Sequence, residues 1–273
     1  MTFVRTALAA GAALTLGGSA ARAQTDYRNL DDGRPVATED AYVIERFAFE
    51  LVAPYRFEAG AAGSDIHALG PELSYGVLPN MQVGLETALA AADQGIDTEW
   101  GVGALEVSAL YNFNTESAGL PALSMRAELQ APVGSLGGDV WRATFSGIAT
   151  RAFGRFRLHL NAARSVGSET GLSALDAAPR WGYGIAGDYT LLRSSLLLVG
   201  ETVVRRAVAG ARVEVNAAAG FRWQWTPTLV LDAGVARRLR SDAGPDLGLT
   251  IGLTHAFAVK GLMPLTASSR RPL

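Results

Sequence analysis

Apolar and polar residues alternate with a period of two along most of this chain. In residues 46–57, Phe47, Phe49 and Leu51 occupy one set of positions, and the intervening positions include Arg46 and Glu50. Successive side chains of a β-strand point to opposite faces, so this stretch predicts a strand with one apolar and one charged face. About 10 such residues are enough to cross a bilayer at a tilt.

The same alternation recurs up to Phe257 and predicts an antiparallel transmembrane β-barrel of about 12 strands, an all-β fold. Short turns near Pro79, Gly154, Arg193 and Pro227, and a longer link at 114–121, alternate with longer loops rich in Gly, Asp and Ser. Outer-membrane hairpins connect in this way, with short turns on the periplasmic side. The predicted strands cover 46–57, 69–77, 81–89, 105–113, 123–133, 143–153, 156–162, 181–190, 196–204, 213–225, 229–235 and 247–257.

Aromatic residues gather at both ends of these strands, as expected of rings at two membrane–water interfaces. A soluble β-sandwich is the alternative, but it would not need rings at both strand ends. The strand at 143–153 is less regular than the others. There we expect Arg151 to face inward, and Ile148 and Thr150 to face outward.

The beginning of the chain has the features of a secretory signal. Arg5 precedes a short apolar run at 6–16, and Ala21-Arg22-Ala23 forms an A-x-A cleavage site. We therefore expect a signal peptide at 1–23, cleaved after Ala23, and a bacterial outer-membrane location. The expected divisions that follow are a polar periplasmic lead-in at 24–44, the barrel at 45–257 and a periplasmic tail at 258–273.

Composition narrows the chemistry. The chain is 49% hydrophobic, has no cysteine and carries a formal net charge of −2 with dispersed charges, which does not favour nucleic-acid binding. The three histidines show no metal-ligand spacing, and no G-x-S-x-G motif occurs. We accordingly expect no enzymatic activity, no catalytic residue, no metal and no cofactor.

Charged residues are predicted to line the lumen. A cross-strand lattice of ion pairs would stiffen a narrow barrel, whereas gaps in such a lattice would make a pore. Besides Arg151, the candidates are Arg46, Glu50, Arg56, Glu72, Glu86, Glu106, Arg126, Glu128, Arg157, His159, Asp188, Glu201, Arg212, Glu214, Arg222 and Asp232.

Two features bear on whether the lumen is open. Long apolar residues expected inside are few, Val52, Leu110, Val199 and Val230 among them, which disfavours a wholly apolar conduit. The polar residues 26–40 could also enter the periplasmic mouth as a plug. The sequence leaves both alternatives open.

Four stretches resemble an outer-membrane β-barrel transporter-like family labelled MetA-pathway of phenol degradation. They are GRPVATEDAYVIERFAFELVAPYRFE (33–58), PALSMRAELQAPVG (121–134), FGRFRLHLNAARSVG (153–167) and TPTLVLDAGVARRLRSDAGPDLGLTIGLTHAF (226–257). The resemblance implies passage of small organic compounds, aromatic ones among them. The segment 252–257 also looks like an assembly signal read by the barrel-assembly machinery, although here a tail follows Phe257.

Three functional hypotheses remain. The first is a channel for small organic solutes in contact with outer-membrane lipid. The second is a closed structural barrel that binds through its loops. The third, an embedded hydrolase, would require a serine paired with His159 or His255.

Overall fold

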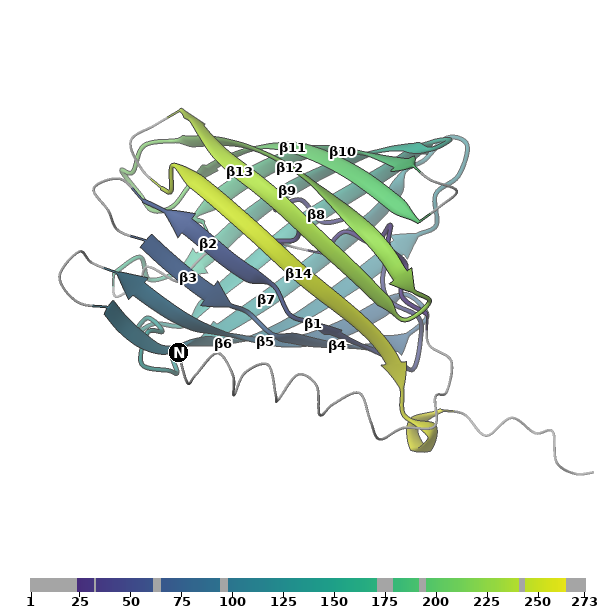
Figure 1. Cartoon of the computed structure of the whole chain (residues 1–273), viewed down its shortest axis with the longest axis horizontal. Coiled ribbons are helices and arrows are strands. Elements are labelled where there is room, and N and C mark those ends of the chain that lie inside the picture. The colour runs from purple at the N-terminus through teal and green to yellow at the C-terminus, as the bar shows by residue number, and fades with distance from the viewer. Residues whose placement is uncertain are drawn as a thin grey trace, which may run out of the picture.

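The computed structural model describes residues 24–31, 33–60, 65–93, 98–170, 179–191, 195–240 and 244–263. These residues form one closed antiparallel β-barrel whose strands are strongly tilted, and a short 3-10 helix, η3 (Lys260–Leu262), follows the last strand (Figure 1). No helix among the described residues is long and apolar enough to cross a membrane. The expected signal peptide and most of the expected tail lie outside the described residues.

The sheet has 14 hydrogen-bonded segments, which correspond to 12 strands of the barrel wall because β1 and β2 are halves of one strand and β3 and β4 are halves of the next. The segments are β1 (Ala48–Val52), β2 (Tyr55–Ala59), β3 (Asp65–Leu69), β4 (Glu72–Leu78), β5 (Met81–Asp93), β6 (Thr98–Asn114), β7 (Ala122–Ala131), β8 (Arg142–Phe153), β9 (Phe156–Gly167), β10 (Trp181–Leu191), β11 (Leu196–Arg206), β12 (Glu214–Thr226), β13 (Leu229–Arg240) and β14 (Leu247–Ala258).

Proline accounts for the two interruptions. Pro54 separates β1 from β2, and Pro71 separates β3 from β4. Proline has no N–H to donate to a ladder, so regular pairing stops at each one. The carbonyl of Pro54 still accepts a bond of 3.0 Å from the Gly70 amide, and that of Pro71 one of 3.3 Å from the Thr87 amide. The wall is therefore continuous through both breaks.

Closure comes from the pairing of the last strand with the first. Phe257 of β14 lies opposite Phe49 of β1, and Leu249 of β14 lies opposite Phe57 of β2. Every neighbouring pair in the ring is antiparallel, and each of the described strands has a partner on both sides. The prediction of an antiparallel barrel of about 12 strands is confirmed.

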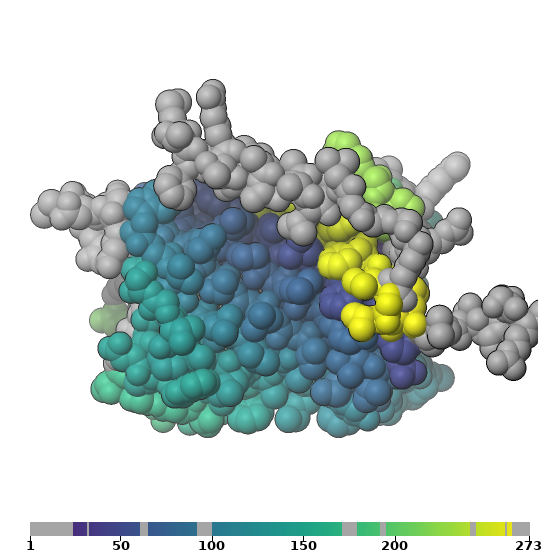
Figure 2. Space-filling view, turned by 90° about the horizontal axis from the view of Figure 1, so that it is seen from below, coloured from purple at the N-terminus to yellow at the C-terminus, as the bar shows by residue number. Residues whose placement is uncertain are grey.

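Side-chain exposure follows the predicted alternation. Leu129 and Leu249, on the predicted outer face, are 45% and 43% exposed. Glu50 and Asp188, on the predicted inner face, are buried. Figure 2 shows one side of the outer surface, where the blue and teal strands make a continuous wall.

The predicted register of β8 is wrong. Ile148 and Thr150 are buried and point inward, at 3% and 0% exposure. Arg151 consequently faces outward, and it pairs with Glu116 at 3.5 Å and donates hydrogen bonds to the carbonyls of Ser117 and Ala118. Acceptors in the neighbouring turn bind the guanidinium of Arg151, so its charge can be accommodated on the outer face. The charge therefore did not predict which face of β8 is the inner one.

The two ends of the barrel differ as expected. Short connections such as Pro79-Asn80 and Gly154-Arg155 lie at the end where residues 45–47 and 259–263 also lie, and we call this the terminal end. The longer connections, including 132–141 and 207–213, lie at the opposite end, which we call the loop end. Gly154 has a φ of 68°, a left-handed conformation that suits glycine in a two-residue turn.

Candidate functional site: the barrel lumen

Residues 24–31 and 33–44 lie inside the barrel and fold back on themselves, with the Asp40 amide bonded to the Leu30 carbonyl at 3.0 Å, and we call residues 24–44 the inner segment. Its trace, purple in Figure 1, runs within the ring of strands. Its hydrogen-bond and ion-pair partners come from nearly every strand of the wall. They are Glu50, Gln82, Asn112, Ser124, Arg126, Thr150, Arg157, Asn161, Glu201, Arg222, Gln224, Asp232 and Thr254.

Glycines on the inner wall make room for this segment. A Cβ at Gly220 would lie 2.7 Å from the Cβ of Pro35, and one at Gly234 would lie 2.3 Å from the Pro35 carbonyl oxygen. At Gly184 a Cβ would lie 2.6 Å from the hydroxyl oxygen of Thr38. Distances below 3 Å are closer than carbon atoms in contact normally approach, so side chains at these positions would displace the segment.

The few apolar residues on the inner wall pack against the same segment. Leu30 and Val36 contact Leu197, Val199 and Val230 of β11 and β13 in one buried cluster. A second cluster joins Ala41 of the inner segment to Leu110, Ala122 and Ile148. The inner segment is therefore held by apolar packing as well as by polar contacts.

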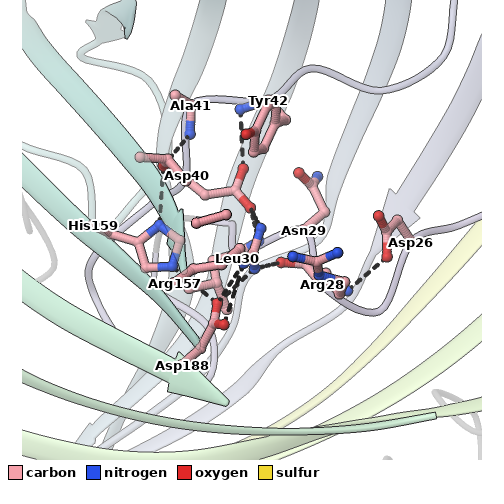
Figure 3. A network of polar contacts seen from close by, with 12 residues as sticks. Asp26, Arg28, Asn29, Leu30, Asp40, Ala41, Tyr42, Arg157, His159 and Asp188 are labelled. Carbon is pink, nitrogen blue, oxygen red and sulfur yellow. Dashed lines mark hydrogen bonds and ion pairs between the residues drawn. The ribbon is translucent and has the colours of Figure 1, made fainter. Parts of the chain in front are cut away.

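Arg157 is the centre of a polar network in the lumen, shown in Figure 3. Its guanidinium donates to the Asp188 carboxylate at 2.6 Å and to Asp40 of the inner segment at 3.0 Å, and it also donates to the carbonyl of Arg28. His159 lies 2.9 Å from Asp188. Arg157 thus links β9 and β10 to two separate points of the inner segment.

A second network joins the inner segment to the opposite wall. Arg34 donates to Asp31 at 2.5 Å, to Asp232 at 3.2 Å and to the Thr254 hydroxyl at 2.8 Å. Arg222 donates to Asp31 at 3.0 Å. Each of these charges is nearly or wholly buried, and each faces an opposite charge, as burial requires.

Two further contacts anchor the loop-end half of the inner segment. Arg126 pairs with Glu39 at 3.1 Å and with Glu128 at 2.5 Å. Glu201 accepts hydrogen bonds from the backbone amides of Ala37 and Thr38, both at 2.8 Å, and from the Thr38 hydroxyl at 2.7 Å.

Burial and neighbouring cations shift two acids of the inner segment in opposite directions. Burial alone would raise the pKa of Asp31, but Arg34 and Arg222 outweigh it and hold that pKa below the ordinary 3.8. Burial raises the pKa of Asp40 above 3.8, although Arg157 opposes the rise. Asp31 therefore favours the docked inner segment above its ordinary pKa, whereas Asp40 favours it less as the pH rises through that range.

Cavities lie on both sides of the inner segment. A cavity of about 880 Å³ opens at the terminal end and is lined by residues that include Tyr27, Glu50 and Gln224. On the loop-end side, a cavity of about 230 Å³ is lined by residues that include Arg56, Glu86 and Glu106, and a smaller one of about 130 Å³ lies beside it. Residues of the inner segment line all three cavities.

The structure places most of the predicted lumen residues on the inner wall. Besides the outward-facing Arg151, two candidates lie elsewhere: Arg46 is exposed in the turn before β1, with its guanidinium 4.4 Å from the ring centroid of Phe47, and Arg212 is exposed between β11 and β12. Both residues precede the strands β1 and β12, so the alternation of a strand does not determine where their side chains point. The candidates on inward-facing positions are Glu50, Arg56, Glu72, Glu86, Glu106, Arg126, Glu128, Arg157, His159, Asp188, Glu201, Glu214, Arg222 and Asp232.

Sequence reasoning missed the residues of the inner segment that meet these charges. The segment has no period, so no pattern predicts where Asp31, Arg34, Glu39 and Asp40 point. The signal that was present is the short set of inward apolar residues, such as Val199 and Val230, which need a dry partner inside a polar lumen.

Neither a metal site nor a serine–histidine pair is formed by the described residues. They include no group of three or more His, Asp or Glu side chains able to hold a metal ion. His159 contacts Thr150 and Asp188, and His255 contacts the Thr228 carbonyl.

The fold resembles solved outer-membrane barrels. The COG4313 outer membrane channel from Pseudomonas putida F1 matches with a TM-score of 0.62 at 15% identity, covering 84% of this chain and all (100%) of that chain. A KdgM porin in complex with disordered oligogalacturonate matches at 0.52 and 15% identity, over 76% of this chain and 99% of that one. The NanC porin matches at 0.51 and 10% identity, over 77% and 100%.

These likenesses establish the fold, that of a closed barrel like those of outer-membrane channels. No protein-family model matches the chain, and no curated protein matches it in sequence.

Proposed function

We propose that this protein is a bacterial outer-membrane channel for small organic solutes, and that the inner segment is its gate. One observation carries the proposal: the cavities at the two ends of the lumen are separated by residues 24–44, which belong to no strand of the wall. Displacing the inner segment would join the cavities without breaking a single strand pair.

The character of the lumen supports a path for hydrated solutes. Its inner wall carries both acids and bases, several of them paired with each other, which suits a path for polar solutes. The outer wall is apolar, as contact with lipid requires. The solved barrels of the same fold are named as channels and porins. The sequence resemblance to the MetA-pathway family supports aromatic compounds among the solutes.

The placement of the chain in the envelope belongs to the same proposal. We take residues 1–23 as the export signal, the terminal end as periplasmic and the barrel-assembly machinery as the partner that inserts the barrel. Segment 258–273 would then be a periplasmic tail.

A closed structural barrel is the second candidate, and the density of ion pairs around the inner segment favours it. Arg157, Arg34 and Arg126 each bind both the wall and the inner segment. If these contacts never open, the loops would be the only working surface. The two candidates differ in whether solutes cross.

An engineered disulfide separates the two candidates. A Cβ placed on Gly184 would lie 3.7 Å from the Cβ of Thr38, within the separation that a disulfide spans. The natural chain has no cysteine, so T38C/G184C would form one defined bond between the inner segment and β10. Solute flux into liposomes, with uncharged aromatic and sugar probes, would be measured before and after reduction.

For a gated channel, the oxidised double variant should pass solute at least tenfold more slowly than the reduced one. The single variants T38C and G184C should not respond to reductant. Equal flux in both redox states would exclude the inner segment as the gate. No flux in the wild type or in any variant, with a folded barrel, would favour the closed structural barrel.

A further inference from the structure

The lipid-facing surface of four neighbouring strands carries an unusual row near the loop end. Strand register places Arg164 of β9 beside Trp181 of β10, and Trp181 beside Arg206 of β11. Phe145 of β8 completes the row beside Arg164. The Arg206 guanidinium lies 5.6 Å from the Trp181 ring centroid, a cation–π distance.

Within the part of the chain that the structure describes, no acid pairs with either arginine of this row. Among the described residues, neither Arg164 nor Arg206 makes an ion pair, and the Nε of Arg206 is buried without a hydrogen-bond acceptor. Outward-facing Arg151 at the terminal end, by contrast, is paired with Glu116. A cation held at the edge of a lipid-facing wall is stabilised by an anion, and the row presents two of them.

An apolar groove begins directly below this row, towards the middle of the wall. Its volume is about 740 Å³. The next two rows of outward residues line it, with Gly147 and Ala162 beside Tyr183 in one and Ala149 beside Leu160 in the other. A Cβ on Gly147 would meet no atom within 4 Å, so this position is the open floor of the groove.

We propose that this sector of β8–β11 binds one phosphorylated glycolipid of the outer leaflet. The phosphate would be held by Arg164 and Arg206, the sugar would lie against Trp181, and an acyl chain would occupy the groove. Guanidinium groups suit phosphate because they donate paired hydrogen bonds, and two strand spacings put these arginines about 10 Å apart at the backbone. The inference rests on the proposed placement in the outer membrane with the loop end outside.

Lipid retention by the purified full-length barrel in detergent tests this proposal. Native mass spectrometry would count bound lipid A, and a titration would give its affinity. Lipid A with both phosphates removed and inorganic phosphate serve as the two other probes. We expect one lipid A per barrel, at least tenfold weaker binding of the dephosphorylated form, and no displacement by millimolar inorganic phosphate.

Variants separate the two parts of the site. R164A/R206A should weaken lipid A binding at least tenfold by removing the phosphate partners, and G147F should weaken it by filling the groove. R237A is the matched control, because Arg237 is an exposed, outward arginine at the loop end of β13. A233F, outward on the same strand, controls for an added ring on the lipid face. Both should bind within twofold of the wild type.

Equal binding by R164A/R206A and R237A would overturn the proposal, as would equal affinity for dephosphorylated lipid. Displacement by inorganic phosphate would also overturn it, since the site would then be one for free anions. Migration of each unheated variant on a denaturing gel verifies that the barrel is folded. Lipid binding is measured without solute flux, so failure here leaves the channel proposal untouched, and failure of the flux assay leaves this one untouched.

Discussion

Arg157 joins the barrel wall to the inner segment through two buried ion pairs. It is buried at 2% exposure and meets Asp188 on the wall and Asp40 on the inner segment. Removing it would leave the buried carboxylates of Asp40 and Asp188 without the guanidinium that both of them bind (Figure 3).

We expect R157A to lower the free energy of unfolding by roughly 3–5 kcal/mol, the usual cost of leaving a buried ion pair half removed. Urea titration of the detergent-solubilised barrel, followed by tryptophan fluorescence, would measure it. Arg155 is the control, because it is exposed in the adjacent turn, and R155A should change stability by less than about 0.5 kcal/mol. Similar losses in the two variants would mean that Arg157 has no special structural role.

The inner segment is the element that distinguishes this barrel from an empty ring of strands. It has no regular structure of its own, so its position is fixed by its partners on the wall. Glu201 holds it through two backbone amides and one hydroxyl, contacts that a carboxylate makes only when the segment is docked.

We expect E201A to expose the inner segment to trypsin, with cleavage after Arg28 at least roughly tenfold faster than in the wild type, since several charge-assisted hydrogen bonds are lost. Mass spectrometry of the digest over time would give the rates. E58A is a suitable control, since Glu58 is another half-buried acid on the inner wall. Equal rates for wild type and E201A would show that Glu201 does not hold the segment.

Two loops at the loop end are joined by a single carboxylate. Glu169 accepts hydrogen bonds from the Ala209 amide at 2.7 Å and from Arg180 at 2.6 Å. The Ala209 amide, followed by Arg180, holds the pKa of Glu169 below its ordinary 4.5. A lowered pKa means that the ionised form favours the joined loops, so this contribution is present above pH 4.5 and is lost as the pH falls through the lowered value.

The Ala209 amide should therefore be protected from hydrogen exchange at neutral pH and lose that protection, relative to its intrinsic rate, as the solution is acidified below the ordinary pKa. E169Q should be poorly protected at every pH. Protection that does not change with acidification in the wild type would count against the carboxylate as the link.

At the scale of the whole molecule, the outer face of the wall is apolar and suits lipid, whereas the inner face is polar. Val107 of β6 is 51% exposed on the apolar outer face. Ser146 of β8 lines the loop-end cavity on the inner face. A charged side chain added to the outer face should lower the stability of the barrel, because lipid does not solvate a charge. The same side chain on the inner face should lower it much less.

We expect V107R to destabilise the barrel folded in lipid vesicles by about 2–4 kcal/mol, the cost of an arginine near the bilayer midplane. S146R should cost much less, because its guanidinium reaches a polar cavity. Unfolding in guanidinium chloride would compare the two. A larger loss for S146R would contradict the assignment of the two faces.

The sequence determined the wall of this protein. A period-two alternation such as that around Leu129 predicts strands with one apolar face. In a membrane, a closed barrel lets those apolar faces contact lipid while every backbone amide is paired. Most inward charges could be placed for the same reason, since direction within a strand is fixed by parity. The assumption that a charged strand residue faces inward was wrong for Arg151. Its ion pair with Glu116 stabilises the charge on the outer face.

The tertiary structure alone decided what fills the lumen. Residues 24–44 carry no period, so their path depends on contacts with residues up to 220 positions away, such as that between Arg34 and Thr254. The inward glycines and the few inward apolar residues acquire their meaning only when Pro35, Thr38 and Leu30 lie against them. The local alternation determines whether a side chain of the wall points outward or into the lumen. The position of residues 24–44 in the lumen depends instead on simultaneous contacts with many strands.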